Sequence, residues 1–96
     1  MIDQQDIPVC ELESFKIAFG KVVERHRVAE GLGQRAFARV AGIGNSHLRL
    51  IESGGVNLSF ATAFKISSAL GVALFELVRE AEILAKEFEV PALKGC

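Results

Sequence analysis

Tryptophan and tyrosine are absent from this 96-residue chain, which also contains only two cysteines, two prolines and one methionine. Cys10 and Cys96 lie near opposite ends, so they form neither a disulfide framework nor a metal-binding knuckle, and we expect free thiols. No apolar run is long enough to span a bilayer, and the first thirteen residues lack the basic start and apolar stretch of a signal peptide. We therefore expect a cytoplasmic protein.

The arrangements that catalysis requires are also missing. The sequence shows no nucleophile–base pair in phase, no cluster of carboxylates, no metal-ligand spacing and no phosphate-binding glycine loop. A chain of this length can bury a modest core, but it cannot also build the walls of a deep catalytic cleft. We therefore predict that the protein is not an enzyme and that it uses no cofactor, metal or small-molecule ligand.

The net charge is only −1, but the charges are distributed unevenly along the chain. Residues 14–65 carry eight bases and three acids, and eight less three leaves +5. Residues 1–13 carry four acids and no base, and residues 66–96 carry five acids and three bases. A basic middle between acidic ends is typical of a domain whose centre binds a polyanion.

Apolar residues recur at spacings of three and four along most of the chain, which is the period of amphipathic helices. No segment alternates with the period of two that a strand requires. Glycines separate the helical segments, Ser59 is suited to cap the fourth one, and Pro91 prevents the last one from continuing. The predicted helices run from Leu12 to near Gly31, over about 34–41, over 45–53, from about Phe60 to Leu70, and over about 73–89.

These segments predict an all-α domain of five helices with a long C-terminal helix. We place the domain at residues 12–90, with a helix-turn-helix unit at about 34–53. Residues 1–11 are expected to form a flexible tail, and residues 91–96 a frayed one.

The unit at 34–53 has the features of two short helices that cross steeply. Ala38 supplies a small residue at the crossing, and Gly42 permits the left-handed conformation that a tight turn needs. The apolar residues fall where such a unit buries its side chains, and they are Phe37, Ile43, Leu48 and Ile51.

Residues 19–78 resemble the lambda-repressor-like family of helix-turn-helix proteins, also called the Cro/cI or XRE type. The matching segments are FGKVVERHR, GLGQRAFARVAGI, HLRLIESG and ATAFKISSALGVALFELV. Members of the family are five-helix DNA-binding domains, usually dimeric transcription regulators, whose third helix lies in the major groove. The resemblance implies a sequence-specific DNA-binding regulator, with repression as the expected mode.

The resemblance also implies which side chains meet DNA. Gln34 matches a glutamine that opens the second helix and contacts a phosphate, where free N–H groups and the helix dipole favour an anion. Asn45 and Ser46 match positions that reach base edges. The remaining candidates lie on the same two helices and are Arg35, His47, Arg49 and Leu50.

The chemistry of these side chains suits base recognition, because arginine pairs with guanine, asparagine with adenine, and leucine contacts a thymine methyl group. Simpler alternatives remain open. Arg35 and Arg49 are equally suited to be solvated surface charges, and His47 to be a surface residue near a helix start.

Arg27 and Glu52 match a pair that joins the first helix to the end of the third in the family. We interpret them as a semi-buried ion pair that fixes orientation rather than as DNA contacts.

Two departures from the family pattern concern the affinity for DNA. Gly33 and Gly44 stand where a serine or threonine cap is frequent, and the loop GGVN carries no base, which predicts weaker and less salt-sensitive binding.

The last predicted helix carries two apolar stripes, of which one would pack inward and the other meet a second copy. We predict a homodimer, which would place two recognition helices about one DNA turn apart. A single wide face that packs against the chain's own core is the alternative. The first stripe, Leu74, Leu77, Ala81, Leu84 and Phe88, is the predicted interface; Phe75, Val78 and Ala85 form the second.

A different class of function also fits the sequence. An antitoxin-like or accessory protein-interaction module, built on the same scaffold with weak DNA binding, would explain the acidic ends and the loop without bases. The dependence of DNA affinity on salt separates the two hypotheses.

Overall fold

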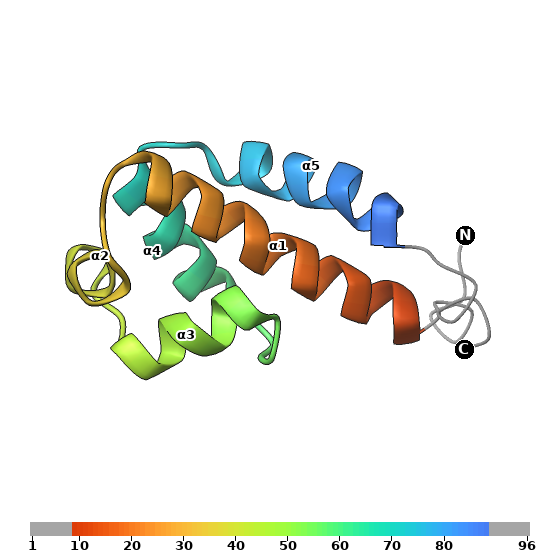
Figure 1. Cartoon of the computed structure of the whole chain (residues 1–96), viewed down its shortest axis with the longest axis horizontal. Coiled ribbons are helices and arrows are strands. Elements are labelled where there is room, and N and C mark those ends of the chain that lie inside the picture. Colours follow the sequence, from red (N-terminus) through yellow and green to blue (C-terminus); the bar gives the residue numbers. More distant parts are fainter. Residues whose placement is uncertain (1–8, 89–96) are drawn as a thin grey trace.

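Five α-helices and a short 3₁₀ turn make up most of residues 9–88, the part of the chain that the computed structural model describes (Figure 1). No strand occurs in this range, so the prediction of an all-α, five-helix fold is confirmed. The helices are α1 (Val9–Ala29), α2 (Gln34–Ala41), α3 (Asn45–Ser53), α4 (Phe60–Leu70) and α5 (Leu74–Ala85), and the 3₁₀ turn is η2 (Lys86–Phe88).

Two predicted boundaries differ from the observed ones. α1 begins at Val9, so the expected tail at 1–11 is too long by at least three residues. α5 ends at Ala85 and tightens into the 3₁₀ turn, whereas the sequence predicted an α-helix to about 89. The tail predicted at 91–96 lies outside the described residues.

Hydrogen bonds at the helix ends explain where the elements begin and end. The Ser59 hydroxyl accepts a hydrogen bond of 3.1 Å from the Thr62 N–H and caps α4, as its position predicts. Gly42 closes α2 with φ of 75°, and the next residue, Ile43, donates its N–H to the Ala38 carbonyl at 3.0 Å. A side chain at Gly42 would strain this left-handed turn, which sets the direction of α3.

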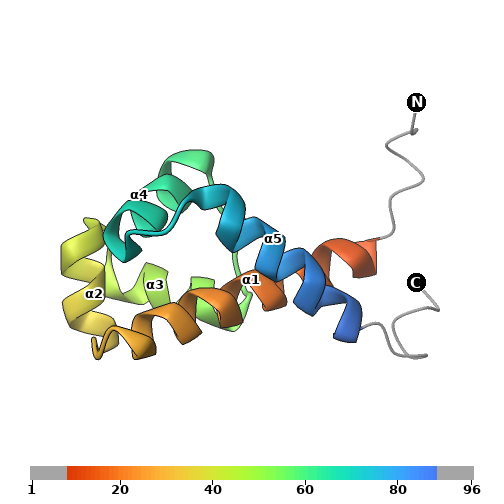
Figure 2. The same ribbon diagram turned by 90° about the horizontal axis from the view of Figure 1, so that it is seen from above.

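α1 is the longest helix, and α5 runs beside it in the opposite direction (Figure 1). α2, α3 and α4 gather around the C-terminal half of α1, as the view in Figure 2 shows. The axis of α4 and that of residues 74–88 meet at 101°. Within the described residues no single helix is long and apolar enough to cross a membrane. The bent pair formed by α4 and residues 74–88 reaches that length and apolar composition only when the two segments are taken together.

One hydrophobic core unites the five helices. Each helix contributes at least one side chain with less than 2 % exposure, and each such side chain stabilises the fold by about 1.5–3 kcal/mol. The largest are Val22 and Val23 of α1, Phe37 of α2, Leu48 of α3, Ile66 of α4 and Leu77 of α5.

The orientation of α5 contradicts most of the predicted dimer interface. Leu77, Ala81 and Leu84 are at most 7 % exposed and belong to the core, so they cannot also contact a second copy. Leu74 and Phe88, at the two ends of the stripe, are half-buried against the same core. The prediction is wrong for Leu77, Ala81 and Leu84, because α5 packs this side against α1.

α1 and the end of α3 approach each other at a glycine. A Cβ atom at Gly20 would stand 2.7 Å from the carbonyl oxygen of Glu52 and still closer to that of Ile51. Both neighbours are backbone atoms, so neither can move aside without shifting α3. Position 20 therefore sets the distance between the two helices.

Replacing Gly20 with alanine should lower the free energy of unfolding by about 1–3 kcal/mol or more, because the added methyl group overpacks this contact. In a helix free of tertiary contacts the same change would stabilise by about 1 kcal/mol, so the sign of the effect is diagnostic. Urea unfolding followed by circular dichroism measures it. Lys21→Ala, at the exposed neighbouring position, serves as the control and should change stability little.

Candidate nucleic-acid interface

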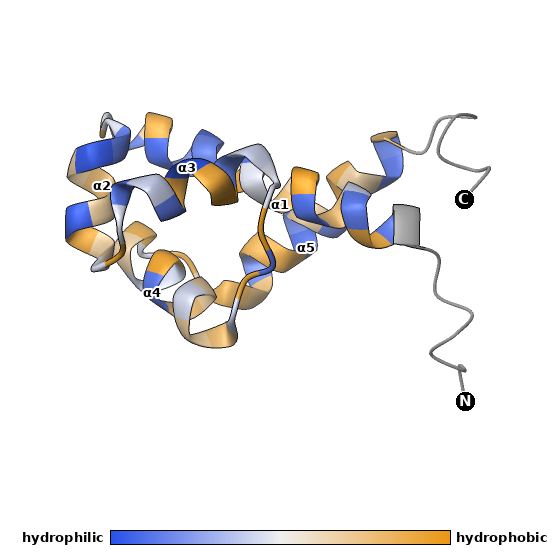
Figure 3. Ribbon diagram, turned by 90° about the horizontal axis from the view of Figure 1, so that it is seen from below, coloured by the Kyte–Doolittle hydropathy of each residue, from blue (hydrophilic) through white to orange (hydrophobic). Residues whose placement is uncertain are grey.

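The helix-turn-helix unit consists of α2, the turn at 42–44 and α3. Ala38 is only 2 % exposed at the crossing of the two helices, and Ile43 in the turn packs against the core. α3 lies along the lower edge of the molecule in Figure 1, and no other helix of the described chain covers its lower side. Hydrophilic and hydrophobic residues alternate around both helices in Figure 3, as expected for helices with one buried side.

The outer side of α3 presents three of the predicted DNA contacts. Ser46, Arg49 and Leu50 are exposed and line a shallow hollow on the surface. Leu48 and Ile51 point inward and are at most 2 % exposed. Because two apolar residues anchor the helix from beneath, its polar side stands clear of the body.

Asn45 and His47 are less accessible than the other candidates. Both are half-buried at the start of α3, and the Asn45 Oδ1 atom is buried without a hydrogen-bond partner among the described residues. Such an unpaired oxygen costs about 1–3 kcal/mol. The Asn45 oxygen is therefore not available to a base, and only the amide N–H₂ group remains to donate to a base acceptor.

The starts of α2 and α3 share a feature that suits phosphate binding. Neither Gly33 nor Gly44 caps its helix with a side chain, and the first intrahelical bonds are donated by Phe37 and Leu48. The N–H groups of residues 34–36 and 45–47 therefore have no intrahelical acceptor. Free N–H groups at a helix start, together with the helix dipole, favour an anion. The missing caps thus leave donors that a phosphate can use.

A buried ion pair joins α1 to α3. The Arg27 Nε atom donates to Glu52 Oε2 at 2.7 Å, and Arg27 Nη2 donates to Glu52 Oε1 at 3.0 Å. The third guanidinium nitrogen, Nη1, donates to the Leu32 carbonyl at 2.7 Å. Arg27 is 7 % and Glu52 9 % exposed, so this is the structural pairing that the resemblance implied. Its two-pronged geometry fixes the rotation as well as the distance of the partners.

The same carboxylate also holds Gln34. The Gln34 Nε2 atom donates to Glu52 Oε1 at 2.8 Å, so one amide hydrogen is committed inside the protein. Only the second hydrogen of that group remains free to donate elsewhere, so the backbone N–H groups are the larger set of free donors at the start of α2. The sequence placed Gln34 at the helix start but did not indicate this bond.

The hydrogen bond to Glu52 raises the pKa of Arg27 above its ordinary value, although burial opposes the increase. For a base, a raised pKa in the folded state means that the stabilisation is complete below the unfolded value and is lost only as pH rises through the folded value. Both values lie far above neutrality, so Arg27 keeps its charge across the neutral range.

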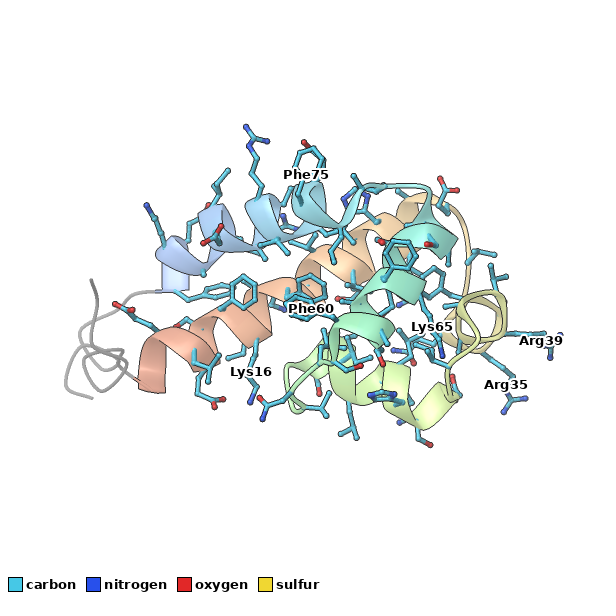
Figure 4. The ribbon with its side chains drawn as sticks, turned by 180° about the vertical axis from the view of Figure 1, so that it is seen from behind. Lys16, Arg35, Arg39, Phe60, Lys65 and Phe75 are labelled. Carbon is cyan, nitrogen blue, oxygen red and sulfur yellow. The ribbon has the colours of Figure 1, made fainter. Side chains whose placement is uncertain are left out.

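Basic side chains gather at the α2 end of the molecule. Arg35 and Arg39 on α2 are exposed, and Figure 4 shows both pointing away from the body at the same end of the molecule. Lys65, on α4, lies at that end as well (Figure 4). Arg39 was not among the predicted DNA contacts, although its spacing of four from Arg35 places both on one side of α2.

Substitution of one partner in the ion pair, by Arg27→Met or Glu52→Met, should destabilise the fold by about 3–5 kcal/mol, because the other charge stays buried and unpaired. The double variant Arg27→Met/Glu52→Met should be less destabilised than Arg27→Met alone. Thermal unfolding of the variants gives the comparison. Losses that simply add would show that the two side chains do not act as a pair.

Comparisons with known proteins agree with this geometry. A family model described as "Helix-turn-helix" matches residues 23–77. The crystal structure of the restriction-modification controller protein C.AhdI from Aeromonas hydrophila is 31 % identical over 64 % of this chain and 92 % of its own, with a TM-score of 0.62. The clp gene regulator ClgR from C. glutamicum shares the fold, with 21 % identity over 74 % of this chain and 91 % of its own, and a TM-score of 0.70.

No curated protein matches the chain by sequence. The residues that the family model matches, 23–77, nevertheless include all of α2, α3 and α4, together with parts of α1 and α5. They contain the steep crossing, the ion pair and the exposed side of α3 described above. The chain belongs to the XRE-type helix-turn-helix family of DNA-binding transcriptional regulators.

Proposed function

We propose that this protein represses transcription by binding a specific duplex DNA sequence in the cytoplasm as a homodimer, with α3 of each copy in the major groove. The observation that carries the proposal is the exposed side of α3, where Ser46, Arg49 and Leu50 stand clear of the protein body between two helix starts with free N–H groups. Side chains suited to bind bases and N–H groups suited to bind phosphates thus lie on adjacent parts of one surface.

The dimensions of α3 suit the major groove. The diameter of an α-helix with its side chains, about 10–12 Å, matches the groove width of about 12 Å, and the nine residues of α3 are about 13 Å long. Arg49 is the candidate partner of a guanine, Leu50 of a thymine methyl group, and Ser46 of either a donor or an acceptor on a base edge. Asn45 and His47 lie at the end of the helix that enters first, where the Asn45 amide donates.

Phosphate contacts would come chiefly from the start of α2. Gln34 and Arg35 lie there beside three N–H groups without an intrahelical acceptor. The loop after α3, residues 54–59, contains no lysine or arginine, so it adds no cation to the backbone contacts. The number of charged contacts is therefore small, and so is the expected dependence on salt.

A homodimer would read two half-sites about 34 Å apart, one helical turn of DNA. C.AhdI is a restriction-modification controller protein, and a regulatory role for the similar chain fits this proposal. An accessory protein-interaction module is the second candidate. It is favoured by the large aromatic side chains exposed on α4 and α5, Phe60, Phe64 and Phe75. The DNA-binding measurements below distinguish it, because such a module would bind duplexes weakly and without preference.

Arg49→Ala should weaken binding to a selected duplex by about 1–3 kcal/mol, or roughly 5- to 150-fold, if this side chain reads a base. The duplex is obtained by selection from a random-sequence pool with the wild-type protein, and affinity is measured by fluorescence anisotropy. Arg79→Ala, which removes an equally exposed arginine from α5, is the matched control and should leave the affinity unchanged. Equal losses for the two variants would refute base reading by Arg49.

Arg35→Ala should act differently, because a phosphate contact carries no sequence information. We expect affinity for selected and scrambled duplexes to fall by the same factor. The plot of log affinity against log salt concentration should become less steep by about 0.9, the contribution of one neutralised phosphate. A slope identical to that of the wild-type protein between about 50 and 200 mM salt would show that Arg35 does not contact a DNA phosphate.

A further inference from the structure

The charges of the described chain differ between the two ends of the molecule. Exposed bases from α2 and α4, Arg35, Arg39 and Lys65, lie at one end (Figure 4). The start of α1 and the end of α5 form the opposite end (Figure 1). Four exposed glutamates and two lysines lie there, and they are Glu11, Glu13, Glu82, Glu87, Lys16 and Lys86. A polyanion is therefore attracted to the α2 end rather than to the opposite one.

The chain segment that forms the α2 end has almost no acid to offset its cations. Residues 31–75 carry four bases and one acid, and that acid is Glu52, which is buried in its pair with α1. The ion pairs found among the described residues all use other bases. The donors of Arg35, Arg39 and Lys65 are therefore available to a ligand.

The two arginines of this end are placed to act together. Arg35 and Arg39 are four residues apart on α2, and Figure 4 shows both pointing away from the body. Four residues of helix rise about 6 Å, and one strand of DNA carries a phosphate every 3.4 Å or so along the duplex axis. A guanidinium can donate two parallel hydrogen bonds to one phosphate. The cations thus extend the phosphate-binding region of the α2 start by one helical turn.

We propose that Arg39 and Lys65 bind phosphates of the DNA that flanks the bases contacted by α3. These two residues are called the flank surface below. The proposal rests on the DNA-binding role of the proposed function and adds a second contact region to it. The loop that follows α3, residues 54–59, contains no base, whereas α2, which precedes α3, carries two. The added phosphate contacts therefore lie on the α2 side of the recognition helix.

Duplex DNA fits the flank surface better than an acidic protein does. The surface continues from Arg35 and from the free N–H groups at the start of α2, which already suit phosphates. The centre of a protein–protein interface is instead enriched in aromatic side chains and depleted of charge. The exposed residues of α2 include no aromatic side chain. An acidic protein is therefore treated as an alternative outcome of the test.

Duplexes of two lengths test the proposal. One is the shortest selected duplex that keeps specific binding, and the other is extended by about ten base pairs, one helical turn, at either end in turn. Each neutralised phosphate makes the plot of log affinity against log salt concentration steeper by about 0.9. On at least one extended duplex the wild-type slope should be steeper by about 1.8, which is an extra loss of about 12-fold between 50 and 200 mM salt.

Removal of the flank surface should abolish this difference. Arg39→Ala/Lys65→Ala should show the same slope on short and extended duplexes and should bind the short duplex as the wild type does. The matched control is Arg79→Ala/Lys86→Ala, which has the same net charge and should keep both wild-type slopes. All four side chains are exposed and alanine favours helix, so both double variants should keep the wild-type circular dichroism spectrum and melting temperature.

Ethylation of single phosphates locates the contacts independently of salt. Ethylation outside the short duplex should weaken binding of the wild-type protein to the extended duplex. The same modification should have no effect on Arg39→Ala/Lys65→Ala. Ethylation within the short duplex should affect both proteins alike.

Equal wild-type slopes on all duplexes would overturn the proposal, and so would equal losses in the two double variants. Loss of affinity by Arg39→Ala/Lys65→Ala on the short duplex alone would place these residues within the half-site instead. If that variant bound every duplex as the wild type does, an acidic protein would be the remaining occupant of this surface. A wild-type protein without preference for the selected duplex would refute the proposed function itself, whereas specific binding without an effect of length refutes only the flank contacts.

Discussion

The contact between Gly20 and the last carbonyl groups of α3 determines how α3 is held against α1. Because Gly20 has no Cβ atom, α1 approaches the Ile51 and Glu52 carbonyls more closely than any other residue would allow. The guanidinium of Arg27, two turns further along α1, donates two hydrogen bonds to the Glu52 carboxylate, with N···O distances of 2.7 and 3.0 Å. The glycine sets the distance between the helices and the ion pair sets the rotation of α3. The direction of its outer side follows from both.

The carboxylate of Glu52 extends this constraint to α2. By accepting a hydrogen bond from Gln34 at 2.8 Å, it ties the start of α2 to the end of α3 and, through Arg27, to the last turn of α1. The N–H groups at the starts of α2 and α3 are thereby held in fixed relation to each other, without serine or threonine caps that would occupy them. A rigid frame thus supports donors that remain free, which is the condition for binding a ligand without reorganisation.

The two C-terminal helices differ in whether their large apolar side chains are buried or exposed. α5 turns Leu77, Ala81 and Leu84 into the core beside α1, whereas α4 leaves Phe60 and Phe64 in solvent. Solvation of these exposed rings is unfavourable.

The sequence alone was sufficient for the helices, the turn at Gly42 and the Ser59 cap, because periodicity and capping are local properties of a few neighbouring residues. Helical geometry also placed positions 46, 49 and 50 on the outer side of the third helix, and family resemblance added the Arg27–Glu52 pair. Only the tertiary structure decided which stripe of α5 is buried, that Phe60 is exposed, and that Gln34 is partly committed to Glu52. The physical reason is that helical periodicity identifies an apolar side but not the neighbour that covers it; that depends on the crossings of distant segments, such as the 101° angle between α4 and residues 74–88.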